Sequence, residues 1–229
     1  MRIRIKFSKM GSLRYIGHLD VMRFFQKVVR RAGLDVVYSE GFSPHMLMSF
    51  AQPLGVGVTS VGEYFDLDIH TSKTSKEMMK LLNEQMPEEA EILSVVKIPE
   101  DKASKCMTLV AAADYAVAMK NGDITKYADA FEKFMAQDKI EVVKKTKRSE
   151  TLTDIKPLVY SWGFSNGNLV FKCGAGSVNN LKPALLLKTF FEFCGKDYES
   201  LSFEIQRREL YAERDGEFIP LYKLGEEIV

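Results

Sequence analysis

The chain has 229 residues, of which 46% are apolar and 28% are charged, and its formal net charge at pH 7 is +1. This length fits one large or two small domains, and the apolar content excludes a wholly disordered protein. The near-zero net charge excludes a strongly basic protein of the histone type, but it does not show where the charges lie.

The first half of the chain shows two kinds of periodicity. Alternating charged and apolar residues at 2–7 predict a strand with one basic and one apolar face. Helical periodicity over 21–32, ended by Gly33, predicts a helix whose apolar stripe lies opposite a basic side. The patterns that follow predict strands at 45–52, 62–70 and 90–98 and a helix at 75–86. The predicted order is therefore β-α-β-β-α-β over residues 1–98.

The second half repeats this order by pattern, without visible sequence similarity to the first half. The predicted elements are strands at 107–119, 140–147, 168–173 and 202–213, helices at 123–137 and 182–193, and a strand at 217–222 that pairs back through an Asp215-Gly216 turn. The pattern over 157–162 is ambiguous and allows a short helix. We therefore predict an α+β protein of two ferredoxin-like (βαββαβ) halves in tandem, at 1–98 and 106–229.

The sequence shows no signature of a membrane helix, a signal peptide or a cysteine-based metal site. No apolar run approaches the roughly 20 residues that a membrane helix needs, and the start, MRIRIKFSK, has no signal-peptide core. The three cysteines, Cys106, Cys173 and Cys194, form no CxxC pair, which argues against a zinc site or an iron–sulfur cluster. We expect a cytoplasmic protein with three free thiols, no metal, no cofactor and no membrane partner.

Positive charge is concentrated at the N-terminus. Residues 1–31 contain nine Lys and Arg against one acid, Asp20, a local charge of +8, whereas six acids against one lysine give 84–101 a charge of −5. We expect Arg2, Arg4 and Lys6 to point to the sheet face that the helices leave open. A phosphate-rich partner would complement such a surface, because neutralised phosphates release counterions. The alternative is an ordinary solvated surface.

A second basic run, at 144–148, follows a predicted strand and fits a basic hairpin that grips RNA as well as it fits an exposed loop. Exposed aromatics such as Tyr15 and Phe42 would stack on unpaired bases. The predicted RNA contacts are Arg2, Arg4, Arg14, Arg23, Lys27, Arg30, Lys144, Lys145, Lys147 and Arg148.

Candidate acid–base residues occur at the start of the first helix and in the turn after it. They are His18, Asp20, Glu40 and His45, and they would form a site if these two segments converged in the fold. Capping and turn roles explain the same residues equally simply. The glycine-containing segments 51–57 and 173–177 are interpreted as turns, and 8–15 has no phosphate-binding glycine motif.

Distinctive motifs also occur along the first 66 residues. They are RIKFSKMGSLRYIGHLD (4–20), RRAGL (30–34), YSEGFSPH (38–45), SFAQPLGVG (49–57) and EYFD (63–66). These motifs resemble the bacterial radical-SAM-associated domain of unknown function, which occurs alone or as the C-terminal part of larger radical-SAM proteins. The second half matches more loosely, through DIKPLV (154–159) and the region around 176–183. The resemblance implies a bacterial cytoplasmic protein that works beside a radical-SAM enzyme as its partner.

Three hypotheses for function follow. The leading one is a non-catalytic RNA-binding module for tRNA or rRNA, or a module that presents a substrate to another enzyme. The second is a metal-independent RNA-processing or RNA-modifying enzyme that uses His18, Asp20, Glu40 and His45. The third is an adaptor that docks on a radical-SAM enzyme, with the acidic segment 84–101 as its docking surface.

Overall fold

The computed structural model describes residues 1–70, 73–145 and 150–229, without the side chains of residues 144, 145 and 150. The strands are β1 (Arg2–Lys9), β2 (Met48–Phe50), β3 (Thr59–Asp68), β4 (Ile92–Ile98), β5 (Val110–Met119), β6 (Glu141–Lys145), β7 (Glu150–Asp154), β8 (Val159–Ser165), β9 (Asn168–Gly174), β10 (Phe203–Arg214) and β11 (Glu217–Pro220). Within these residues, nine strands form one sheet in the order β4-β1-β3-β10-β5-β9-β8, with β2 beside β3 and β11 beside β10. The strands β6 and β7 form a separate hairpin.

The large sheet consists of two parts with matching strand order. In the N-terminal part, β4, β1, β3 and β2 are neighbours in that order, and every pair is antiparallel. In the C-terminal part, β10, β5, β9 and β8 are neighbours in that order, and again every pair is antiparallel. The two parts join where β10 runs parallel to β3, with Gln206 opposite Thr59 and Arg207 opposite Ser60. The mixed sheet and its helices confirm the α+β class.

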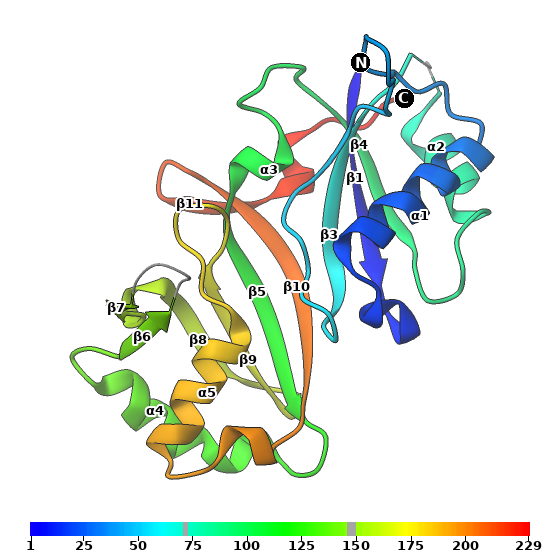
Figure 1. Cartoon of the computed structure of the whole chain (residues 1–229). Coiled ribbons are helices and arrows are strands. Elements are labelled where there is room, and N and C mark those ends of the chain that lie inside the picture. The colour runs from blue at the N-terminus through cyan, green and yellow to red at the C-terminus, as the bar shows by residue number, and fades with distance from the viewer. Residues whose placement is uncertain (71–72, 146–149) are drawn as a thin grey trace.

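The helices are α1 (His18–Arg31), α2 (Ser75–Asn83), α3 (Cys106–Leu109), α4 (Ala128–Ala136) and α5 (Pro183–Phe193). Short 3-10 turns accompany them: η1 (Gly11–Tyr15), η2 (Ile124–Tyr127), η3 (Lys156–Leu158), η4 (Tyr198–Ser200) and η5 (Leu221–Leu224). Figure 1 shows α1 and α2 against the N-terminal strands and α4 and α5 against the C-terminal strands. No helix of the described ranges is long and apolar enough to cross a membrane.

Helix α1 packs on the sheet through the apolar stripe that its periodicity predicts. The buried residues of the helix are Val21, Phe25, Val28 and Val29, and they join β1 residues in one buried cluster. The rings of Phe7 and Phe25 are 4.4 Å apart between centroids. This packing buries the apolar face of α1, so its basic side chains lie on the outer face.

The opposite face of β1 is covered, which corrects the expectation of an open basic surface. The Arg4 side chain is fully buried, and its guanidinium donates to Asp66 and to the backbone carbonyls of Ser104 and Leu221. The segment before α3 and the turn η5 therefore lie over this face. A strand's own alternation shows that its two faces differ, but it cannot show what packs against each.

The C-terminal tail returns to the N-terminal part of the sheet. Glu226 forms a bridge with Lys97 of β4, and the backbone N–H of Ile228 donates to the Ser75 hydroxyl at the start of α2. The two chain ends consequently lie close together (Figure 1). The tail thus helps to fix η5 over the β1 face that carries Arg4.

Most predicted elements occur, with shifted boundaries. The β10–β11 turn is confirmed, with Asp215 and Gly216 both at positive φ. The ambiguous 157–162 segment is mostly strand β8, entered through η3. The strand expected from residue 107 begins at Val110, because one helical turn, α3, precedes it. The strand β7 was not predicted.

Candidate functional site

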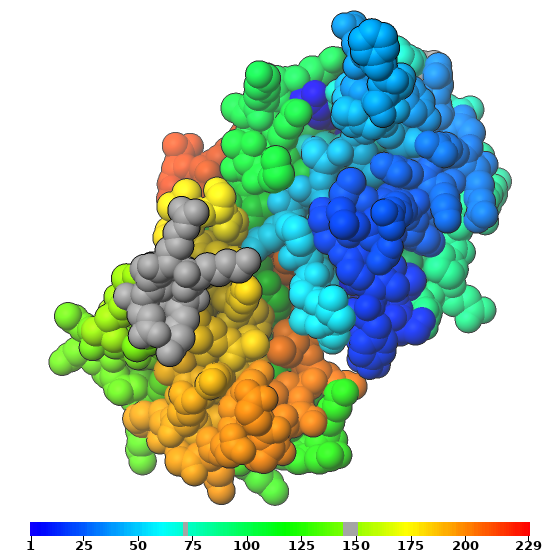
Figure 2. Space-filling model, viewed as in Figure 1, coloured from blue at the N-terminus to red at the C-terminus, as the bar shows by residue number. Residues whose placement is uncertain are grey.

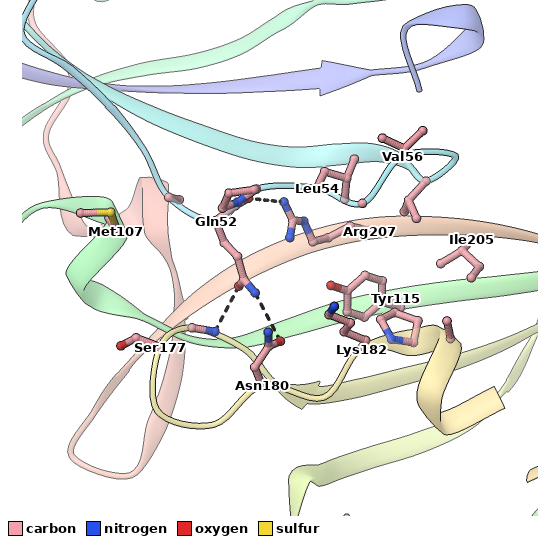
Figure 3. Close-up of a pocket in the computed structure, with 17 residues that line it drawn as sticks. Gln52, Leu54, Val56, Met107, Tyr115, Ser177, Asn180, Lys182, Ile205 and Arg207 are labelled. Carbon is pink, nitrogen blue, oxygen red and sulfur yellow. Dashed lines mark hydrogen bonds between the residues drawn. The ribbon is translucent and has the colours of Figure 1, made fainter. Parts of the chain in front are cut away.

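A pocket of about 650 Å³ opens where the two parts of the sheet meet (Figure 3). Its lining comes from four places: the 51–58 loop between β2 and β3, Met107 of α3, the strands β5 and β10, and the segment 176–184 at the start of α5. Small-molecule sites typically have volumes of about 300–1,000 Å³ and lie at such junctions. This pocket, called the junction pocket below, is therefore the leading candidate for a binding site.

A buried ion pair lies beside the pocket. The Nε of Arg207 donates to Glu63 Oε1 at 2.7 Å, its Nη2 donates to Glu63 Oε2, and the same Nη2 donates to the backbone carbonyl of Gln52 at 2.8 Å. Burial alone would lower the pKa of Arg207, but the neighbouring carboxylate of Glu63 raises that pKa above its usual value. The pair joins β10 to β3 and leaves the pocket floor close to neutral.

Tyr115 of β5 lines the pocket beside this pair. Burial raises the pKa of Tyr115, and the nearby Arg207 opposes that shift only in part. The phenol therefore stays protonated at neutral pH. It can donate or accept a hydrogen bond there, but it is not a base.

The side chain of Gln52 connects the two sides of the pocket (Figure 3). Its Oε1 accepts from the backbone N–H of Gly176 at 3.1 Å, and its Nε2 donates to Asn180 Oδ1 at 3.4 Å. Gly176 has φ of +105°, and a Cβ there would lie 2.2 Å from the carbonyl oxygen of Val110. The two glycine-containing segments that the sequence presents as turns therefore line the pocket from opposite sides.

The pocket loop also contacts helix α1. His18 and Val21 of α1 line a small neighbouring cavity together with Gln52, Pro53 and Leu54 of the loop. Figure 2 shows the helix and the loop on the same face of the molecule. At the mouth of the pocket Lys182 is exposed, and so are the apolar side chains of Val56 and Met107.

Five of the predicted RNA contacts form two groups. Arg23, Lys27 and Arg30 are exposed on α1, and the ion pair of Arg23 with Asp20, at 3.4 Å, joins two exposed side chains and holds neither firmly. Arg2 instead donates to both carboxylate oxygens of Asp68, as Arg4 does to Asp66. Arg2 and Arg4 are therefore engaged in structural contacts.

The remaining predicted contacts are placed as follows. Arg14 is half-buried over the ring of Tyr15 at 5.2 Å, and its Nε is without a hydrogen-bond partner among the described residues. The backbones of Lys144 and Lys145 pair with β7 in the β6–β7 hairpin. Lys147 and Arg148 lie outside the described residues.

The four candidate acid–base residues do not share a pocket. His18 packs edge-on against Phe50 at 5.4 Å between ring centroids. His45 lies in a different pocket, with its Nδ1 2.8 Å from the Ser39 hydroxyl. Asp20 and Glu40 are exposed. Across the ranges that the structure describes, no three His, Cys, Asp or Glu side chains gather in a way that could hold a metal ion.

A further charged cluster crosses three strands, and the sequence reasoning missed it. Glu209 of β10 accepts from Lys6 Nζ at 2.7 Å and from the Tyr64 hydroxyl at 2.5 Å, and burial raises the pKa of that hydroxyl. A signal for this kind of pairing was present. Asp66 and Asp68 alternate as Arg4 and Arg2 do, and antiparallel register sets them opposite each other.

The family of the chain follows from a family model that matches residues 2–183. The chain belongs to DUF2344, described as an uncharacterized protein conserved in bacteria. The description names no activity, RNA or radical-SAM enzyme, so the link to radical-SAM proteins stays a prediction.

Known structures add little to this assignment. The chain resembles a chain in the solved structure titled "Crystal Structure of a Cbf5-Nop10-Gar1 Complex", with a TM-score of 0.45 and 13% sequence identity. The match covers 93% of this chain and 50% of that chain, so the present chain spans about half the length of the chain it matches. This likeness is too remote to indicate a function. No match was found among curated proteins.

Proposed function

We propose that this protein is a non-catalytic RNA-binding module for tRNA or rRNA that presents its RNA to another enzyme. The observation that carries the proposal is the exposed row Arg23, Lys27 and Arg30 on α1. Their spacing of four and three residues puts them on one side of the helix, and they span about 10 Å along its axis. A row of this length can contact more than one phosphate.

The placement of the candidate acid–base residues supports binding over catalysis. His18 and His45 line different pockets, so they cannot act together as acid and base on one bond. In the junction pocket, Arg207 is neutralised by Glu63 and Tyr115 is a neutral phenol. These groups position a ligand and do not exchange protons with it.

We further infer that the chain consists of two ferredoxin-like halves, 1–98 and 106–229, with the C-terminal tail packed back on the first. The matching strand order of the two sheet parts supports this. A cytoplasmic radical-SAM enzyme is the proposed partner, on the sequence resemblance. A pull-down with the two purified proteins, with and without RNase treatment, tests whether they bind each other directly.

The RNA proposal is tested by fluorescence anisotropy with tRNA and rRNA fragments across a salt series, with duplex DNA for comparison. The variant is Arg23→Glu with Arg30→Glu, and the matched control is Lys126→Glu with Lys133→Glu, two exposed lysines of the C-terminal part. We expect the α1 variant to bind more weakly and to lose about 0.7 from the salt slope for each lost contact on single strands. Equal binding by both variants would contradict the proposal.

A further inference from the structure

The junction pocket has an apolar wall suited to a flat ring. Leu54 of the pocket loop, Ile205 of β10 and Pro183 of α5 line it together with Tyr115 (Figure 3). An aromatic side chain such as Tyr115 stacks on a base of any identity, because every base has a π-face, and aliphatic side chains pack against the same flat ring. The wall therefore favours an aromatic ligand over a sugar or an inorganic anion.

Polar groups lie at the other end of the same pocket. Gln52 and Asn180 line it with side-chain amides, and Ser177 lines it with a hydroxyl. Gln52 and Asn180 already bond to each other through Nε2 and Oδ1, so the groups left for the hydrogen-bonding edge of a base are the second N–H of Gln52, the N–H groups of Asn180 and the Ser177 hydroxyl. A ring that lies on the apolar wall would direct its polar edge toward these groups.

The charge distribution divides the pocket into a neutral interior and a cationic mouth. In the interior, Glu63 neutralises Arg207 through two hydrogen bonds. At the mouth, Lys182 is exposed. A nucleotide has the same division, with a neutral base and an anionic phosphate, and about 650 Å³ leaves room for its ribose as well.

The pocket also adjoins the proposed phosphate-contacting helix. The loop that lines the pocket with Gln52 and Leu54 lines the small neighbouring cavity with His18 and Val21 of α1. Figure 2 shows the loop and α1 on one face. A nucleic-acid strand held along α1 can thus reach the mouth of the pocket without crossing the molecule.

We propose that the junction pocket binds one unpaired nucleotide of the bound RNA, with the base against Leu54 and Ile205 and the phosphate at Lys182. This inference rests on the proposed RNA binding and names the part of the RNA that the pocket takes. It assigns α1 to sequence-independent phosphate contact and the pocket to an unstacked base.

The first test uses AMP, GMP, CMP and UMP as probes, each titrated into the full chain and followed by calorimetry. Ala184→Trp fills the pocket from an exposed position of α5, Lys182→Glu reverses the charge at the mouth, and Ala136→Trp is the control at an exposed position of α4 outside the pocket. We expect at least one nucleotide to bind the unchanged protein and the control. Binding should be lost in Ala184→Trp and weakened about tenfold or more in Lys182→Glu.

A second arm separates failure of the pocket from failure of the RNA proposal. With RNA as the probe, Ala184→Trp should weaken binding about tenfold and lower the salt slope by no more than the one phosphate contact at Lys182, about 0.7, because a base contact itself releases no counterion. The α1 variant Arg23→Glu with Arg30→Glu should bind mononucleotides normally. RNA binding that Ala184→Trp leaves unchanged, with no mononucleotide bound, would overturn the pocket assignment alone. Mononucleotide binding without RNA binding would support the pocket and overturn the proposed function.

Discussion

Replacing Arg207 by methionine should destabilise the protein strongly. Arg207 is 1% exposed and is held by two hydrogen bonds to Glu63 and one to the carbonyl of Gln52. Arg207→Met removes the guanidinium that is hydrogen-bonded to Glu63 and leaves this carboxylate buried, with only the Coulomb attraction of the nearby Lys9. Removing one partner of a buried pair costs about 3–5 kcal/mol, a large share of a typical total of about 5–15 kcal/mol.

The double variant Arg207→Met with Glu63→Leu is expected to be more stable than either single variant. It removes both charges together and leaves mainly the carbonyl of Gln52 without its donor, at about 1–3 kcal/mol. The assay is urea unfolding at pH 7, followed by circular dichroism, for the four proteins of the cycle. Arg30→Met on the exposed face of α1 is the control, with an expected change within about 0.5 kcal/mol.

Two results would refute this reasoning. One is a loss of less than about 1 kcal/mol in the free energy of unfolding of Arg207→Met, since a buried carboxylate without its hydrogen-bonded cation destabilises the fold by more than that. The other is a double variant whose loss equals the sum of the single losses, because coupled neighbours deviate from additivity. If Arg207→Met does not fold, Arg207→Lys is measured instead. It keeps the charge without the bidentate contact to Glu63, so its stability should lie between those of the unchanged protein and Arg207→Met.

Three further predictions concern other parts of the fold. Gly62→Ala places a Cβ 2.4 Å from a carbonyl oxygen of β10 and should lower the thermal midpoint, whereas Gly163→Ala, with nothing within 4 Å, should not. Hydrogen bonds from Ser12 lower the pKa of Glu89, so its stabilising contribution is present above about pH 4.5 and is lost as the pH falls through the lowered value. The free energy of unfolding in urea should fall less between pH 5 and pH 3 in Glu89→Gln than in the unchanged protein. An equal fall in both proteins would contradict this. Cys194 is partly exposed and should react with a thiol reagent in the native protein before the two buried cysteines, which should react only after unfolding.

Local periodicity was enough to predict most helices and strands. The stripe over 21–32 predicts α1 because a helix that buries one face must repeat apolar residues every three to four positions. The turn at Asp215-Gly216 is likewise local, since these residues adopt positive φ easily. Element boundaries shifted where a neighbouring segment continued the backbone hydrogen bonding, as in α3 before β5.

Only the tertiary structure decided which charged side chains are available to a partner. Arg4 and Arg23 belong to the same basic segment, yet one is buried against Asp66 and the other is exposed. The candidate pocket likewise brings together Gln52, Gly176 and Arg207, which lie in three distant parts of the chain. Periodicity reports which face of an element differs from the other. It does not report which distant segment covers that face, because that choice depends on long-range packing and pairing.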